Sequence, residues 1–291
     1  MQVVYHLGAH CTDEDRLYRT LLKNKGELGR RGIITSGPGR YRRVLREAIN
    51  TLRGETASKE LQEDILAAVM DEDHAERLVF SNEQFVCAAQ KVLAENRIYP
   101  QMGEKTAWFS RLFPDADTEF FVALRNPATF IPALFERTNE DDFAAFIAGV
   151  NPVDLRWSET LARMRTAAPG ARIVTWCNED SALIWPDILH SMAGLPPEEP
   201  LDGELDFIGS LMVPEGIVRM ESYLASHPVK TGFQRQRVTS AFLDKYALPE
   251  AIEEEIDLPG WTIDLVDRMT AIYVEDCHRI SQMDGIEMLT P

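Results

Sequence analysis

The sequence predicts an α/β protein built on a doubly wound parallel sheet, and three observations support this fold class. Four β-rich apolar runs recur along the chain and are separated by amphipathic helical stretches. Each run ends in polar residues, and ligands of such sheets bind beyond the carboxyl ends of the strands. The 291 residues, 45% of them hydrophobic, are enough to bury a sizeable core.

The chain opens with a strand, a turn and a helix. The β-rich run at residues 3–5 enters a polar turn at residues 8–12, and a helix with one apolar face follows as far as Gly32. Three residues could cap the start of this helix: Thr12, Asp13 and Asp15.

The turn at residues 8–12 has the geometry of an anion site, but its charge opposes an anion. The first amides of a helix lack intrahelical partners and, together with the helix dipole, attract anions. Gly8 allows the backbone to converge on such a ligand, whereas Asp13, Glu14 and Asp15 place three carboxylates at the same point. A divalent cation on these acids would restore a phosphate site, and the alternative is a helix start without a metal.

The remaining elements follow from the same patterns. The other three strands are expected at residues 77–83, 118–124 and 171–177, with a short extended piece at 33–35. Helices are expected at residues 40–53, 58–70, 84–96, 104–113, 128–137, 141–149, 154–167, 184–194, 212–226, 242–248 and 263–283. We expect residues 1–195 to form an α/β domain, and residues 196–291 to form a mostly helical C-terminal extension packed on it.

Polar residues follow each predicted strand, and the topology brings these segments to one edge of the sheet. They are residues 6–12, 81–83, 125–126 and 178–180. Because the carboxyl ends of parallel strands lie at the same edge, we expect these segments to form the functional site.

The charge of the chain is strongly negative and unevenly distributed. The net charge of −17 argues against a general binder of nucleic acids or of anionic membranes. Residues 16–53 nevertheless carry eleven lysines and arginines and two acids, a net charge of +9. This stretch could steer an anionic substrate, or it could be a solvated face neutralised by acids of the same protein.

The cysteines and the hydropathy of the chain predict a cytoplasmic protein. Cys11, Cys87, Cys177 and Cys277 lie far apart in the sequence and form no CxxC motif, so no zinc site is predicted. We expect them to be reduced thiols, with Cys87 and Cys177 buried in core elements. The sequence shows no signal peptide and no apolar run that could span a bilayer, and it leaves the oligomeric state open.

Four segments resemble the sulfotransferase family. Residues 6–12 (HLGAHCT) are similar to the family's donor loop, and residues 124–127 (LRNP) to its second signature, a strand followed by Arg-x-Pro and a helix. Residues 80–83 (FSNE) and 176–180 (WCNED) fit its intervening and later strands. Order and spacing agree across residues 1–195, so the resemblance covers about two thirds of the chain.

The resemblance implies a P-loop-type α/β sheet and a reaction. Members of the family transfer a sulfuryl group from 3′-phosphoadenosine 5′-phosphosulfate (PAPS) to a hydroxyl or amine of a small-molecule or glycan acceptor. By resemblance, PAPS would contact the loop and the second signature, and a base would deprotonate the acceptor. The residues that would bind PAPS are Gly8, Ala9, His10, Thr12 and Arg125, and the candidate bases are His10 and Glu83.

The sequence departs from the family pattern in both signatures. The family lysine falls at Cys11 and the second glycine at Asp13. The loop hydroxyls fall at Glu14 and Asp15, and the serine that accompanies Arg125 falls at Ala133.

Each candidate also has a plainer interpretation. His10 could be a solvent-facing turn residue, Glu83 a helix N-cap, and Arg125 the partner of a neighbouring acid. Cys11 could be a nucleophile because a helix start lowers a thiol pKa, although the adjacent acids raise it.

Two functions from different classes follow from these observations. The first is a sulfotransferase-like enzyme with a rearranged donor loop. The second is a non-catalytic member of that fold that serves as a binding or assembly protein. A nucleotide kinase or NTPase is disfavoured because the complete Walker A pattern is absent.

Overall fold

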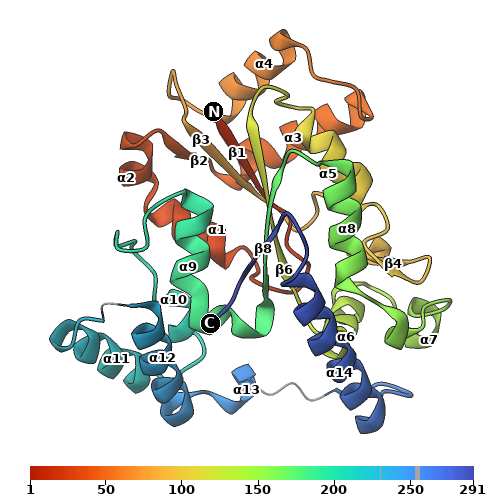
Figure 1. Ribbon diagram of the computed structural model, residues 1–291, viewed down its shortest axis with the longest axis vertical. Coiled ribbons are helices and arrows are strands. Elements are labelled where there is room, and N and C mark those ends of the chain that lie inside the picture. Colours follow the sequence, from red (N-terminus) through yellow and green to blue (C-terminus); the bar gives the residue numbers. More distant parts are fainter. Residues whose placement is uncertain (230, 253–255) are drawn as a thin grey trace.

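The computed structural model describes residues 1–229, 231–252 and 256–291. Its centre is a six-stranded parallel sheet with the order β2-β3-β1-β6-β7-β8 (Figure 1). The strands are β1 (Gln2–His6), β2 (Ile33–Thr35), β3 (Arg77–Ser81), β6 (Asp117–Leu124), β7 (Arg172–Cys177) and β8 (Ile286–Leu289). The predicted α/β class and parallel sheet are therefore confirmed.

Helices cover both faces of the sheet. They are α1 (Arg16–Lys23), α2 (Lys25–Arg30), α3 (Pro38–Leu52), α4 (Lys59–Val69), α5 (Met102–Ser110), α6 (Pro127–Arg137), α7 (Phe143–Phe146), α8 (Trp157–Ala167), α9 (Ser181–Ala193), α10 (Asp206–Gly209), α11 (Pro214–Ser226), α12 (Gly232–Tyr246), α13 (Pro249–Ile252) and α14 (Ile263–Ile280). Helix α1 packs beside α9, while α8 contacts both α5 and α14 (Figure 1). None of the helices in the described part of the chain combines the length and the apolar character that a bilayer crossing requires.

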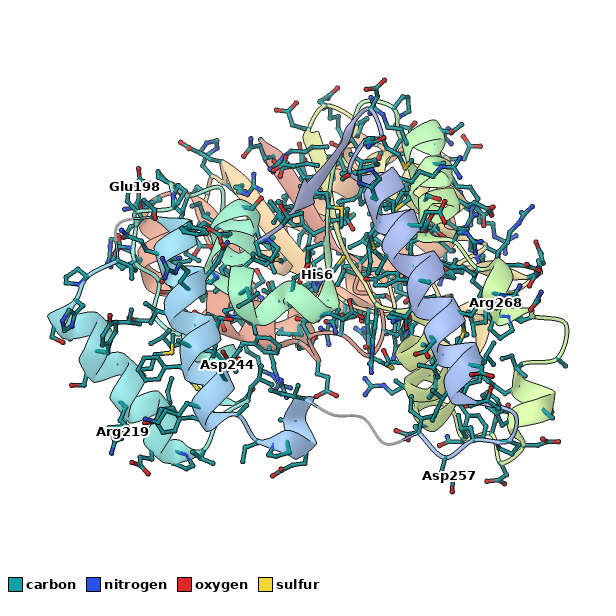
Figure 2. The ribbon with its side chains drawn as sticks, turned by 60° about the horizontal axis from the view of Figure 1, so that its bottom comes forward. His6, Glu198, Arg219, Asp244, Asp257 and Arg268 are labelled. Carbon is teal, nitrogen blue, oxygen red and sulfur yellow. The ribbon has the colours of Figure 1, made fainter. Side chains whose placement is uncertain are left out.

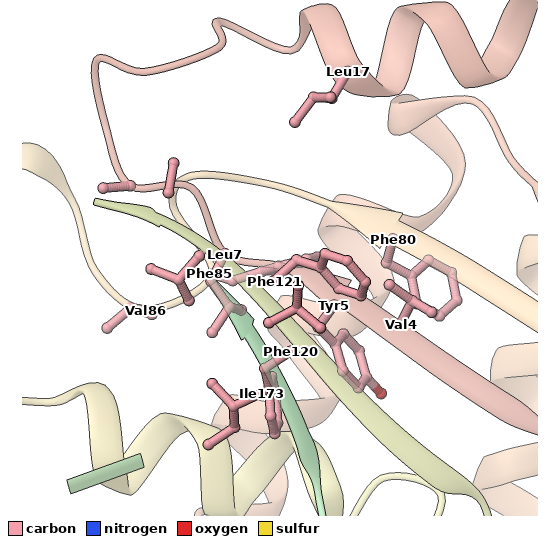
Figure 3. Close-up of a cluster of buried hydrophobic side chains, with 14 of the residues drawn as sticks. Val4, Tyr5, Leu7, Leu17, Phe80, Phe85, Val86, Phe120, Phe121 and Ile173 are labelled. Atoms are coloured by element: carbon pink, nitrogen blue, oxygen red, sulfur yellow. The ribbon is translucent and has the colours of Figure 1, made fainter. Parts of the chain in front are cut away.

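The core lies between the sheet and these helices, and β1 runs through its middle. Tyr5 of β1 is fully buried and stacks with Phe80 of β3 and Phe120 of β6, the two strands that flank it (Figure 3). Phe85 and Phe109 pack against the same ring from outside the sheet. Burial of side chains this large makes the register of the central strands specific.

The prediction of a helix at residues 84–96 is wrong. The segment is a loop with one 3-10 turn, η1 (Ala89–Lys91), and it leads into a hairpin of β4 (Leu93–Ala94) and β5 (Arg97–Ile98). Glu95 and Asn96 form the two-residue turn with φ values of 55° and 54°, as a type I′ turn requires. The apolar residues Phe85, Val86 and Cys87 are consecutive and all buried, which a helix with one buried face cannot achieve.

Most other predicted helices are shifted by no more than three residues at an end, and three differ more substantially. The first predicted helix is divided into α1 and α2 at Asn24, whose side chain bonds the backbone of Thr20 and Asp202. Helix α7 covers only part of residues 141–149. Helix α12 begins at residue 232 rather than 242, and the side chain of Thr231 caps this start by accepting a hydrogen bond from the amide of Gln234.

The C-terminal part of the chain is mostly helical, and its last strand joins the main sheet. Helix α14 packs on α6 and α8, and β8 pairs in parallel with β7. Helices α11 and α12 enclose a small separate core around Met212 and Met220. The division at residue 195 stays a prediction.

Candidate functional site

The four polar segments after β1, β3, β6 and β7 meet at the carboxyl edge of the sheet. His6, the last residue of β1, lies near the middle of the molecule with side chains of the surrounding elements gathered about it (Figure 2). Gly8 approaches Glu83, the Arg125 side chain bonds the backbone of Cys11, and Glu179 bonds the backbone of Asn126. The structure therefore brings together the segments that we expected to form a site.

Gly8 is required at its position by backbone geometry. Its φ is +98°, a conformation that residues with a side chain rarely adopt. A Cβ at this position would lie 3.1 Å from the amide nitrogen of His10 and 3.4 Å from Cα of Glu83. The loop after β1 and the end of β3 are therefore in direct backbone contact, with no space for a ligand between them at this point.

The backbone amide of His10 is bonded to a tyrosine of the same chain. It donates to the hydroxyl of Tyr99, 2.8 Å away, and Nδ1 of His10 lies 2.6 Å from the same hydroxyl. Because the hydroxyl accepts the amide hydrogen, its own proton is available for Nδ1, which favours the imidazole tautomer with the proton on Nε2. Both side chains are almost completely buried.

This arrangement disfavours His10 as a general base. Burial lowers the pKa of His10, so its imidazole is neutral near pH 7. Nδ1 is engaged with Tyr99, and Nε2 is buried with no hydrogen-bond partner in the described residues. The interpretation of His10 as a solvent-facing turn residue is wrong, because only 1% of its surface is exposed.

Arg125 holds the loop after β1 from the end of β6. Its Nη1 donates to the carbonyl oxygen of Cys11, and its Nε donates to Thr129 Oγ1 at 3.1 Å. The residue is 8% exposed, and its own carbonyl oxygen accepts a hydrogen bond from the indole of Trp157. The guanidinium thus has a structural role in this state, since it fixes the backbone carbonyl of Cys11 in the loop after β1.

The other loop positions are also engaged with the protein. The amide of Ala9 donates to the carbonyl of Ala123, which extends the pairing of β1 with β6. The hydroxyl of Thr12 donates to the carbonyl of Ala9 at 2.7 Å. Burial raises the pKa of the Cys11 thiol to about 11, which disfavours the nucleophile interpretation of Cys11.

The three acids of the loop have different surroundings. Asp13 is buried, its carboxylate accepts a hydrogen bond from the amide of Leu17, and burial raises its pKa. Asp15 pairs with Arg42 of α3, which also donates to the carbonyl oxygen of Ser81 at the end of β3. Among the described residues no group of histidines, cysteines and acids is arranged to hold a metal ion.

Glu83 is paired rather than free. Its carboxylate forms an ion pair with Arg137 at the end of α6, and its side chain is 18% exposed. A general base must be able to contact the acceptor hydroxyl, whereas this carboxylate is bonded to the guanidinium of Arg137. Glu83 does not cap a helix either, because no helix begins at residue 84.

Glu179 occupies the start of helix α6. One carboxylate oxygen accepts a hydrogen bond from the amide of Asn126 at 2.7 Å, and the other accepts one from the hydroxyl of Tyr273 at 2.9 Å. Helix starts attract anions, and here the anion is a side chain of the same protein. Asn126 itself caps α6 by accepting from the amide of Ala128.

The residues present do not fit PAPS in this arrangement. The amide of His10 and the guanidinium of Arg125 are bonded to the protein, and Glu179 takes an amide at the start of α6. The position of the family lysine is held by Cys11, and residues 13–15 are acids, of which Asp15 is paired with Arg42. A donor with a phosphosulfate and a 3′-phosphate would meet carboxylates and occupied hydrogen-bond donors.

A basic cleft lies next to this closed region, beyond the end of β3. It has a volume of about 340 Å³, within the size range of small-molecule sites. Its floor is apolar and includes Phe85 and Phe109. Its rim carries three cations: Arg46 of α3, Lys105 of α5 and Lys91. No acid is among its lining residues, although 47 of the 291 residues of the chain are acids.

Sequence reasoning missed several residues that shape the region. The hydroxyl of Tyr99 and the guanidiniums of Arg42 and Arg137 engage the candidate residues, yet they come from segments distant in the sequence. The sequence offered only indirect signals, such as the basic stretch at residues 16–53 that contains Arg42 and Arg46. Several other arginines of that stretch pair with acids of the same protein, in line with the interpretation that the basic stretch is neutralised internally. They include Arg30, Arg31, Arg40 and Arg43.

Comparison with known proteins gives no further assignment. No protein-family model matches the chain, and a search of curated proteins finds no match. Any functional conclusion therefore depends on the residues themselves.

Proposed function

We propose that this chain is a non-catalytic protein of sulfotransferase-like fold that binds a small anionic ligand in the basic cleft. The observation that carries the proposal is the bond from Arg125 to the carbonyl of Cys11. The one cation that the resemblance assigns to the donor is committed to the loop that the donor would have to enter.

The resemblance supports the fold part of this proposal. The four segments that carry it follow four parallel strands of one sheet and meet at one edge. The same segments argue against PAPS-dependent transfer, because the candidate bases are either buried, as His10 is, or ion-paired, as Glu83 is.

The basic cleft supports the second part of the proposal, the binding of a small anionic ligand. Within the described residues, no carboxylate forms an ion pair with Arg46, Lys91 or Lys105, the three cations that line the cleft. Lys105 also lies over the ring of Trp108, with Nζ 3.9 Å from the ring centroid. Three cations above an apolar floor suit a phosphate or sulfate ester with an apolar body.

A thermal shift experiment tests the absence of donor binding. Adenosine 3′,5′-bisphosphate at about 1 mM, with or without magnesium, should cause no increase in melting temperature that depends on Arg125. A ligand that bound with a Kd near 10 μM would stabilise the folded state by about 2.7 kcal/mol at that concentration, a readily measured shift. Such a shift, abolished by Arg125→Ala, would overturn the proposal.

Titration calorimetry tests the cleft. Phenyl phosphate should bind, and phenol should not, because the cations supply most of the affinity. The double variant Arg46→Gln/Lys105→Gln should bind at least about tenfold more weakly, since charged hydrogen bonds contribute roughly 1.5–3 kcal/mol each. The matched control is Arg43→Gln on the same helix, whose side chain pairs with Glu47. Equal affinity of the double variant and the control for phenyl phosphate would show that the cleft is not the binding site.

A further inference from the structure

Two cysteines that lie 100 residues apart in the sequence are neighbours in the structure. Cys177 is the last residue of β7, and Cys277 lies near the end of α14. Their sulfur atoms are 3.4 Å apart, within hydrogen-bond distance for thiols. All four cysteines of the chain are free thiols, and the sequence spacing alone gives no sign that two of them meet.

We propose that Cys177 and Cys277 form a reversible dithiol–disulfide pair that ties the carboxyl end of β7 to helix α14. A disulfide needs a sulfur–sulfur distance of about 2.05 Å, so the two atoms must approach by roughly 1.4 Å. Side-chain rotation on a strand end and a helix can supply a movement of this size.

The surroundings favour Cys177 as the attacking thiol. Cys177 is half-buried, whereas Cys277 is buried, so a small disulfide can reach Cys177 first. The hydrogen bond with the Cys277 thiol lowers the pKa of Cys177, which increases the share of reactive thiolate. The same contact and burial raise the pKa of Cys277.

The reaction with oxidised glutathione balances as a two-step exchange. The Cys177 thiolate attacks one glutathione sulfur, which forms a mixed disulfide and releases the first glutathione as its thiolate. The Cys277 thiol then loses its proton and attacks the Cys177 sulfur, which releases the second glutathione. The two protons from the cysteines end on the two glutathione thiols.

The bond would reinforce contacts that already join these elements. Glu179 lies two residues after Cys177, and Tyr273 lies one turn before Cys277 on α14. The Tyr273 hydroxyl donates to Glu179, which in turn accepts from the amide of Asn126. Oxidation should therefore stabilise the closed end of the sheet, and because the bridged loop is long, the effect on the unfolded chain is large.

Thiol counting on the full chain tests the proposal. The protein is incubated with oxidised glutathione, unfolded in guanidinium with N-ethylmaleimide, and its mass is measured. We expect two alkylated thiols instead of four, a peptide pair that joins Cys177 to Cys277, and a melting temperature higher by roughly 5–10 °C that dithiothreitol reverses. Four alkylated thiols, or a cross-link through Cys11 or Cys87, would refute it.

Matched variants locate the chemistry. Cys87→Ser removes a buried thiol elsewhere and should still form the cross-link and show the thermal shift. Cys277→Ser should stop at the mixed disulfide of Cys177 with glutathione and show no thermal shift. If either variant fails to fold, the peptide map of the oxidised wild type still decides between the expected cross-link and its absence.

Discussion

The hydroxyl of Tyr99 fixes the loop after β1. Its buried hydroxyl accepts from the amide of His10 and also bonds the His10 ring. In a phosphate-binding loop such an amide faces the ligand, whereas here it is satisfied internally. One tyrosine therefore closes the point at which the sequence pattern suggested an anion site.

Replacement of Tyr99 by phenylalanine tests this role. Tyr99→Phe leaves the His10 amide and Nδ1 buried without a partner, so the free energy of unfolding should fall by about 1–3 kcal/mol. Chemical denaturation measures the change. The control is Tyr223→Phe at a residue that is 40% exposed, which should be nearly neutral. Equal stability of both variants would show that the hydroxyl is not needed.

At the scale of elements, a buried ion cluster joins three strands at the amino edge of the sheet. Glu119 of β6 accepts two hydrogen bonds of 2.8 Å from Arg77 of β3, which reaches across β1. Arg172 of β7 bonds the same carboxylate. Arg77 and Glu119 are both almost fully buried, so each charge depends on the other.

Glu119→Gln should destabilise the protein strongly at neutral pH. Removal of one partner of a buried pair costs about 3–5 kcal/mol, because the remaining charge is uncompensated. Glu287→Gln is the control, since that acid pairs with Arg172 while 46% of its side chain is exposed. Urea unfolding at pH 7 measures both variants, and similar losses for the two would contradict this account.

The same cluster predicts the direction of the pH dependence. Burial opposes ionisation of Glu119, but hydrogen bonds and charges from Arg77 and Arg172 outweigh it and hold its pKa below the ordinary 4.5. A carboxyl whose folded-state pKa is lowered contributes stability above its unfolded-state value and loses it as the pH falls through the folded-state value. The stability difference between wild type and Glu119→Gln, measured by urea unfolding at several pH values, should therefore shrink below about pH 4.5. A difference that stayed constant as the pH fell would contradict this assignment.

At the scale of the whole molecule, the sequence predicts the buried strands better than it predicts the edges. Residues 118–124 and 171–177 are β-rich apolar runs typical of a strand in the middle of a sheet, and both form strands. β8 was missed because its four residues are at most partly buried and include an acid, so pairing with β7 decides its structure. The prediction of a helix at residues 84–96 failed because tertiary burial overrides a helical pattern.

For the candidate site too, the sequence predicts local positions and misses long-range contacts. The position of Arg125 at the end of a strand followed from local pattern, and the structure places it there. Its bond to Cys11, the pairing of Glu83 with Arg137 and the contact of Tyr99 with His10 could not be predicted, because each joins residues more than 50 positions apart. Whether a strand end is open or closed depends on such long-range partners.

A crystal soaked with adenosine 3′,5′-bisphosphate tests most directly the claim that the protein closes its own donor region. We expect no nucleotide beside residues 8–12, with the Tyr99 hydroxyl on the amide of His10 and the Arg125 guanidinium on the carbonyl of Cys11. A nucleotide bound against this loop, with Arg125 turned from Cys11 to a phosphate, would contradict the account.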